Sequence, residues 1–260
     1  MLTNHINFRS SVLGYRQKLV VLLPQGEDGK VLPGKLKCLT LLHGLSDDET
    51  AWTRWSNIEV YAEKYGIAVV MPAVEKSFYT NMASGDRFAD YVGEEVLSFL
   101  RSFMPISEKR EDNYVAGLSM GGYGAFKIGL SNPNTFSAAA SLSGVVDMAD
   151  LLTHLEPKKD AQFIHDISLV YGDLSAVKGS RNDIYRLIDD CIKNRNIPRL
   201  FQWCGTEDFL YENNTRFNKK VSTLGIDHVY EEGPGDHSWP YWDSSIQRVL
   251  EWIGLEKLPQ

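Results

Sequence analysis

The chain has 260 residues, of which 43% are hydrophobic and 23% charged, and its formal net charge at pH 7 is −7. This length and balance are typical of one folded globular domain and exclude a disordered or fibrous protein. The negative charge, with no run of lysine or arginine, offers nucleic acid no basic surface, so we expect no nucleic-acid partner.

The chain start and the cysteines indicate a cellular compartment. The first nine residues lack the basic region and apolar stretch of a secretory signal, so we expect a cytoplasmic protein. No apolar segment approaches the ~20 residues that span a bilayer, and we expect no membrane contact. Cys38, Cys191 and Cys204 are odd in number and lack metal or redox spacing, which predicts buried thiols and no metal site.

Short apolar runs alternate with segments of helical period along the chain. The expected strands are residues 5–10, 18–23, 36–42, 67–71, 113–116, 137–142, 199–203 and 228–231. The expected helices are residues 58–65, 93–103, 120–130, 182–193, 213–224 and 241–252. The first two strands have no helix between them and should form an antiparallel edge, whereas the rest predicts a mostly parallel α/β sheet flanked by helices.

The pattern becomes irregular from about residue 145 to residue 181, with a break at residues 157–160. We interpret this segment as an insertion over the carboxyl edge of the sheet, where ligands bind in open α/β folds. No repeat or linker divides the chain. We therefore predict a single domain, residues 1–260, with a cap-like insertion at about 145–181.

A glycine-rich turn stands where an expected strand gives way to an expected helix. Residues 117–121 read Gly-Leu-Ser-Met-Gly, which fits the G-x-S-x-G nucleophile elbow of α/β-hydrolases. The strained turn exposes the serine hydroxyl, and the glycines let neighbouring backbone pass close to it. The alternative is an ordinary glycine-rich turn, but the strand and helix around it favour Ser119 as a nucleophile.

A serine nucleophile needs a histidine base and a carboxylate that orients it. His237 lies in a turn-rich loop between the last expected strand and the final helix, which is the place for the base. Asp208 follows the preceding strand and fits the hydrolase order of serine, acid, histidine. Glu207 and Asp236 are the competing carboxylates, and each could instead be a solvated loop residue.

Acyl transfer also needs N–H donors aimed at the developing oxyanion. The N–H of Met120, directly after the nucleophile, is one candidate. The second is the N–H of Leu45, because an apolar strand runs into His43 and Gly44 just before it. Alone, that pair would indicate an ordinary strand-to-loop turn.

Four segments in this order are similar to the esterase D family, which includes S-formylglutathione hydrolases and bacterial tributyrin esterases. They are residues 43–45 (His-Gly-Leu), 117–124 (Gly-Leu-Ser-Met-Gly-Gly-Tyr-Gly), 204–211 (Cys-Gly-Thr-Glu-Asp-Phe-Leu-Tyr) and 235–239 (Gly-Asp-His-Ser-Trp). The nearest resemblance is to the tributyrin-esterase branch of Gram-positive bacteria. It implies a serine carboxylesterase that hydrolyses small esters with short acyl chains, needs no cofactor, and forms a homodimer or homotetramer.

The resemblance also leaves other activities open. S-formylglutathione hydrolases usually carry a cysteine in the oxyanion loop and a histidine before the nucleophile, whereas here residues 45–48 read Leu-Ser-Asp-Asp and Leu118 precedes the serine. The glutathione thioester is therefore the weaker expected substrate. Acetyl-xylan or feruloyl esterase activity, acyl transfer to another alcohol, and a non-catalytic role are further alternatives.

Several side chains are candidates for contacts with a sugar or phenol, although such residues are more often core packing. The predicted substrate-pocket residues are His43, Gly44, Trp52, Phe209 and Trp239. Trp55, Tyr79 and Tyr241 are further aromatic candidates.

Overall fold

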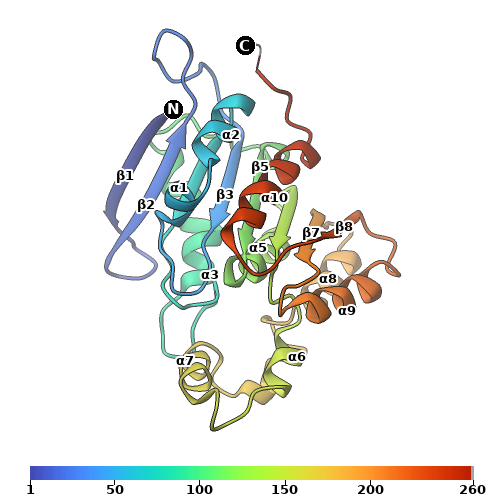
Figure 1. Cartoon of the computed structure of the whole chain (residues 1–260). Coiled ribbons are helices and arrows are strands. Elements are labelled where there is room, and N and C mark those ends of the chain that lie inside the picture. Colours follow the sequence, from blue (N-terminus) through green and yellow to red (C-terminus); the bar gives the residue numbers. More distant parts are fainter. Residues whose placement is uncertain (259–260) are drawn as a thin grey trace.

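The structure, a computed structural model, describes residues 1–258. Its strands form one eight-stranded sheet in the order β1-β2-β4-β3-β5-β6-β7-β8 (Figure 1). They are β1 (Leu2–Arg9), β2 (Arg16–Leu23), β3 (Cys38–Leu42), β4 (Ala68–Pro72), β5 (Asn113–Leu118), β6 (Ala138–Leu142), β7 (Arg199–Gly205) and β8 (His228–Gly233). β2 is antiparallel to both β1 and β4, and all other pairs are parallel. This is the α/β-hydrolase fold, with the predicted antiparallel edge.

Helices cover both faces of the sheet. They are α1 (Ala51–Trp55), α2 (Ile58–Tyr65), α3 (Phe88–Asp90), α4 (Val96–Arg101), α5 (Met120–Ser131), α6 (Met148–Thr153), α7 (Ala161–Tyr171), α8 (Ile184–Lys193), α9 (Tyr211–Val221) and α10 (Trp239–Trp252). Short helical turns of other pitch occur at η1 (Tyr91–Glu95), η2 (Arg110–Asp112) and η3 (Leu174–Ala176).

Two apolar cores lie on opposite faces of the sheet because strand side chains alternate. Leu39 and Leu41 of β3 belong to the core that contains side chains of α2 and α10, whereas Cys38 and Leu42 belong to the core of α4, α5, α8 and α9. The central strands are buried along their whole length, and their continuous apolar runs are what a parallel sheet covered on both faces requires.

Two predicted segments differ from the structure. The expected helix at 93–103 is split, because the π-helical turn η1 precedes α4. The insertion at 145–181 is not irregular: it contains α6 and α7, and the side chain of Asp147 caps α6 by accepting a hydrogen bond from the N–H of Asp150. These helices are short, and residues 157–160, read as a break, lie in the connection between them. Figure 1 places both beyond the carboxyl ends of the parallel strands.

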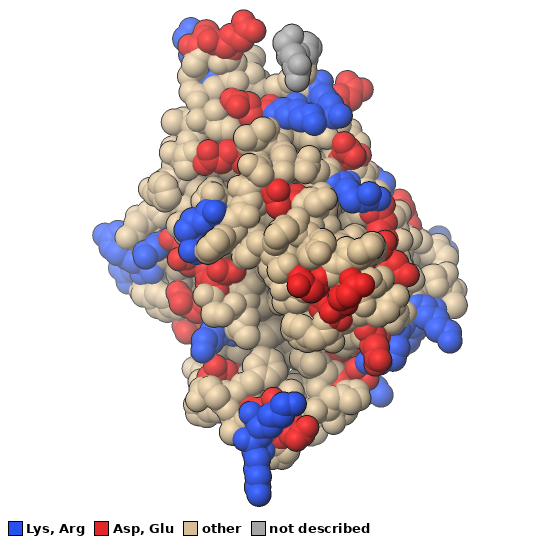
Figure 2. Space-filling view, viewed as in Figure 1, with Lys and Arg blue, Asp and Glu red and all other residues tan. Residues whose placement is uncertain are grey.

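The three cysteines are free and buried, as the sequence predicts. Burial raises the pKa of Cys38 to about 12 and that of Cys191 to about 11, so both thiols stay protonated at neutral pH. Within residues 1–258, no helix combines the length and apolarity that crossing a membrane requires. Figure 2 shows basic and acidic side chains interspersed over the visible face.

Candidate active site

Ser119 occupies a strained turn between β5 and α5. Its φ of 53° and ψ of −118° lie in a region that non-glycine residues rarely adopt. The surrounding backbone is too close for side chains: a Cβ on Gly117 would lie 2.3 Å from the carbonyl oxygen of Gly121, and one on Gly121 would lie 2.4 Å from that of Leu42. The two glycines of the motif are therefore sterically required by this turn.

His237 lies between the serine and a buried carboxylate. Its Nε2 is 3.0 Å from Oγ of Ser119, and its Nδ1 is 3.0 Å and 2.9 Å from the two carboxylate oxygens of Asp208. The Asp208 side chain is fully buried and also accepts a hydrogen bond of 2.8 Å from the N–H of Leu210. The structure thus brings together the three residues that the sequence analysis ranked first.

The two competing carboxylates have other partners. Glu207 binds the loop before the histidine: its N–H donates to the carbonyl of Gly235 at 3.0 Å, and its Oε2 accepts from the N–H of Gly235 at 2.5 Å. Asp236 accepts a hydrogen bond from the hydroxyl of Ser238. Glu207 therefore holds the acid loop and the histidine loop together.

A small apolar cavity of about 250 Å³ opens beside the serine. Its lining residues are Leu45, Phe78, Ser119, Met120, Val145, Leu151, Leu155, Phe163, Phe209 and Leu210. The cap contributes Leu151, Leu155 and Phe163, which the sequence analysis did not identify. The amphipathic pattern of residues 161–171 is the signal that could have found the last of these.

Leu45 and Met120, the expected oxyanion donors, flank this cavity at Ser119. Among the loop and cap hydrogen bonds of residues 1–258, none uses the N–H of either residue as a donor. Both groups are thus free to bind an oxygen at the serine.

The predicted pocket residues have different positions. Phe209 lines the cavity, is 75% exposed, and its ring centroid lies 4.5 Å from that of His237. Trp52 is instead buried, donates a hydrogen bond of 3.1 Å to the carbonyl of Leu42, and packs edge-on against Trp239. Neither tryptophan lines the cavity: Trp52 belongs to an apolar core, and the half-buried Trp239 packs against that core.

Gly44 and His43 lie at the end of β3, where Gly44 packs against Leu118 and Ser119. A Cβ on Gly44 would lie 2.7 Å from Cδ1 of Leu118, so this position accommodates only glycine without movement. His43 is buried, and burial lowers its pKa, which favours the neutral imidazole. Neither residue is among those that line the apolar cavity, and the ring of His43 instead contacts the backbone of Gly44 and Val74.

Two asparagines of α9 join the acid loop to the cap. Asn214 is fully buried and donates hydrogen bonds of 2.9 Å to the carbonyls of Gly144 and Leu210. Asn213 pairs with the N–H and carbonyl of Asp147 at the start of the cap. Both lie on the helix expected at 213–224, but nothing in the sequence pattern predicts a role for them in the site.

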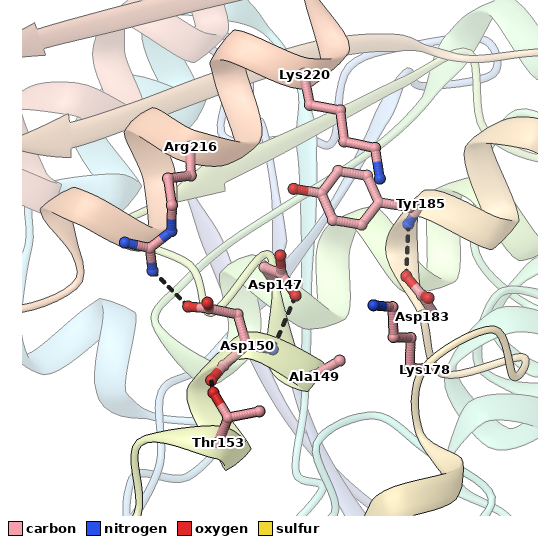
Figure 3. A pocket seen from close by; sticks show the side chains of 9 residues that line it. All are labelled: Asp147, Ala149, Asp150, Thr153, Lys178, Asp183, Tyr185, Arg216 and Lys220. Carbon is pink, nitrogen blue, oxygen red and sulfur yellow. Dashed lines mark hydrogen bonds and ion pairs between the residues drawn. The ribbon is translucent and has the colours of Figure 1, made fainter.

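A second cavity, of about 440 Å³, lies near the other face of α6 (Figure 3). Its charged side chains interact with one another: Arg216 pairs with Asp150, and Nζ of Lys220 lies 3.6 Å from the ring centroid of Tyr185. Ser119 is not among its lining residues.

The chain is similar to known esterases and serine hydrolases over nearly its whole length. Residues 10–253 match the Esterase family model. The chain is 33% identical over 256 residues to an acetyl esterase of Caldicellulosiruptor saccharolyticus. This match covers 95% of this chain and 96% of that protein. Two Staphylococcus aureus structures are each 39% identical and cover 97% of this chain and 98% of theirs. They are FphF, described as a fluorophosphonate-binding serine hydrolase, with a TM-score of 0.87, and FrmB, described as an S-formylglutathione hydrolase, with a TM-score of 0.84.

Proposed function

The chain belongs to the Esterase family of carboxylic ester hydrolases, and from this premise we propose that it cleaves short-chain acyl esters with Ser119, His237 and Asp208 as its catalytic triad. The observation that carries the proposal is the pair of hydrogen bonds by which the imidazole joins the serine hydroxyl to the buried carboxylate. The geometry fits a nucleophile, a general base and the group that orients the base.

The proposed reaction proceeds in two halves. The hydroxyl oxygen of Ser119 attacks the ester carbonyl while Nε2 of His237 takes its proton, and the N–H groups of Leu45 and Met120 stabilise the oxyanion. The tetrahedral intermediate then breaks its bond to the alcohol, which leaves with the proton from His237. Water repeats the sequence on the acyl-enzyme, which releases the acid and restores the serine.

The apolar cavity supports a short acyl chain. Its volume of about 250 Å³ lies below the ~300–1,000 Å³ of typical ligand pockets, and its walls are aliphatic and aromatic side chains. Such a space holds an acyl group of limited size, and a chain that exceeds the cavity would have to displace the cap.

The test is turnover of p-nitrophenyl esters of increasing acyl length by the wild type and by Ser119→Ala. We expect the variant to lose at least about 10⁴-fold in kcat, since members of a triad act as a unit. The matched control is Ser131→Ala, at the exposed end of the same helix, which should keep wild-type activity. An active Ser119→Ala enzyme would refute the assignment.

Thioester hydrolysis is a second candidate, favoured by the likeness to FrmB. Assay of a formylglutathione thioester beside the oxygen esters decides between the two. A higher kcat/KM for the thioester would replace the carboxylesterase proposal, and product analysis with an added alcohol would reveal acyl transfer. A homo-oligomer, cytoplasmic location and absence of a cofactor stay predictions from the sequence.

A further inference from the structure

The carboxylate of Asp47 lies close to the nucleophile. A Cβ built on Gly44 would be 3.7 Å from Cβ of Ser119 and 3.8 Å from Oδ2 of Asp47. The serine and this carboxylate therefore flank the same glycine of the oxyanion loop. The proposed mechanism gives Asp47 no task.

Hydrogen bonds distinguish Asp47 from the next residue. Oδ1 of Asp48 accepts from the N–H and hydroxyl of Thr50 and from Nη2 of Arg54, at 2.9, 2.6 and 3.2 Å. Within residues 1–258, neither carboxylate oxygen of Asp47 accepts a hydrogen bond, and Arg54 approaches it only to 3.9 Å. Asp48 is thus bound through Oδ1 by donors of its own loop and of α1, whereas Asp47 has no such donors.

The partly buried position of Asp47 disfavours its charged form. The side chain of Asp47 is 23% exposed, and burial raises its pKa, because a partly desolvated carboxylate without donors is destabilised. A hydrogen-bond donor or a positive charge on a bound molecule would offset that cost.

Asp47 also faces a cavity of its own. This cavity has a volume of about 270 Å³, and its walls carry four carboxylates and two basic side chains. The lining residues are Tyr15, Arg16, Gln17, Lys18, Asp47, Asp48, Glu49, Ala73 and Glu75. The oxyanion loop therefore contributes Leu45 to an apolar cavity and Asp47 to a polar one. An ester likewise has two parts, an acyl chain and an alcohol.

We propose that Asp47 selects the alcohol portion of the ester, favouring an alcohol that presents a hydrogen-bond donor or a positive charge to this carboxylate and disfavouring an alcohol with a negative charge. This inference rests on the proposed esterase function and adds a substrate class to it. With the acyl chain in the apolar cavity, the alcohol would extend toward the polar side of this loop, where the carboxylate of Asp47 lies across Gly44 from the serine.

The experiment compares acetate esters of matched shape. The 3-(dimethylamino)propyl ester is cationic at neutral pH, the 4-methylpentyl ester is its neutral isostere, and the acetate ester of 4-hydroxybutanoate is anionic. A second comparison, of kcat/KM for glycerol monoacetate and for propyl acetate, measures the effect of hydroxyl donors without a positive charge. For the wild type we expect kcat/KM to be about tenfold higher for the cationic ester than for its isostere, the size of one partly screened charge pair, and lowest for the anionic ester.

Asp47→Asn should bring the kcat/KM values of the cationic, neutral and anionic esters to within about twofold of one another, and this ratio is the readout whatever the absolute rate of the variant. The matched control is Glu27→Gln, which removes one exposed charge on the hairpin after β2; Figure 1 shows this hairpin at the end of the sheet away from the carboxyl ends of the parallel strands. In the wild type, added salt should shrink the preference as well.

The wild type and Asp47→Asn could show the same charge preference while Ser119 is still required for hydrolysis of every ester. That result would overturn the role of Asp47 and leave the esterase proposal standing. No Ser119-dependent hydrolysis of any ester would overturn both.

Discussion

The imidazole of His43 donates a hydrogen bond from Nδ1 to the carbonyl oxygen of Gly44, 2.8 Å away. Its tautomer follows from the other ring nitrogen, because Nε2 accepts from the N–H of Val74 at 3.2 Å. In a trans peptide the N–H points away from the preceding carbonyl. By holding the oxygen of Gly44, His43 therefore fixes the N–H of Leu45 in the opposite direction, away from the imidazole, and we expect it to face the proposed oxyanion.

His43→Leu should lower kcat by about 10- to 100-fold with little change in KM, because a misplaced donor weakens binding of the transition state more than of the ester. The matched variant is Tyr79→Phe, which loses only a hydrogen bond of 2.9 Å to the carbonyl of His43 and should show a smaller effect. Steady-state kinetics on a p-nitrophenyl ester measures both. An unchanged kcat in His43→Leu would show that the loop holds its shape without the imidazole.

The choice between Asp208 and Asp236 as the triad carboxylate can be tested directly. Asp208→Asn should lower kcat by about 10⁴-fold, because an amide at this place favours the wrong imidazole tautomer. Asp236→Asn should leave kcat within about twofold, since its carboxylate contacts Ser238 and not the ring. Both variants replace a carboxylate by an amide, so their kcat values on one p-nitrophenyl ester can be compared directly. The reverse order of effects would move the acid to Asp236.

Chain order and local motif were sufficient to select the three residues that the structure brings within hydrogen-bond distance. Ser119 is marked by its two glycines, and His237 and Asp208 follow from the position of their loops after successive strands. The competing carboxylates could not be excluded in this way, because residues adjacent in sequence differ in direction only once the loop is folded. Glu207 points to the histidine loop, whereas Asp208 points to the imidazole.

The pocket walls were harder to predict than the chemistry. Trp52 and Trp239 look like ligand contacts in the sequence, but in the structure they pack edge-on against each other, with Trp52 in the apolar core. The cap residues gave little signal, because α6 has only six residues and a helix that short shows less than two turns of its period. Tertiary contacts determine which face such a helix buries.

Asn214 is expected to position the catalytic acid. It binds the carbonyl of Leu210, whose N–H binds Asp208, so the effect on kcat should pass through that carboxylate. Asn214→Ala should lower kcat about tenfold with little change in KM, yet cost almost nothing further in an Asp208→Asn background, because coupled residues are not additive. A full additional loss in the double variant would show a general structural role.

The matched control is Asn213→Ala, the neighbouring residue on α9. Its side chain binds Asp147 rather than the acid loop, so the change should act on the cap and raise KM more than it lowers kcat. Thermal unfolding of Asn213→Ala, Asn214→Ala and the double variant separates these kinetic effects from loss of folded protein.

Phe163 of α7 should limit the length of the acyl chain. Its ring lines the apolar cavity, with a centroid 6.4 Å from that of Phe78. Phe163→Ala extends the cavity, so kcat/KM for an octanoyl ester relative to a butyryl ester should rise about tenfold. Leu169→Ala, which removes an exposed side chain of the same helix, should leave that ratio unchanged. A rise in both variants would indicate a loosened cap.

His228 should make the protein less stable in mild acid. Burial lowers its pKa from 6.5 to about 4, despite the opposing charge of Asp227. Between these two values the unfolded chain binds a proton that the folded chain does not, so the free energy of unfolding falls as pH falls, by at most about 3 kcal/mol below pH 4. His43, whose pKa burial also lowers, adds to the same trend.

Urea unfolding at pH 7 and near pH 4.5 measures this loss. His228→Gln keeps a donor for Oε1 of Gln202, which lies 3.2 Å from Nε2 of His228, but binds no proton. The difference in unfolding free energy between the two pH values should therefore shrink in this variant without vanishing, since His43 still contributes. His154→Gln, at an exposed position of the cap, should keep the wild-type difference. If His228→Gln kept it as well, the acid sensitivity would have to arise from other buried groups, with His43 the first to test by the same measurement.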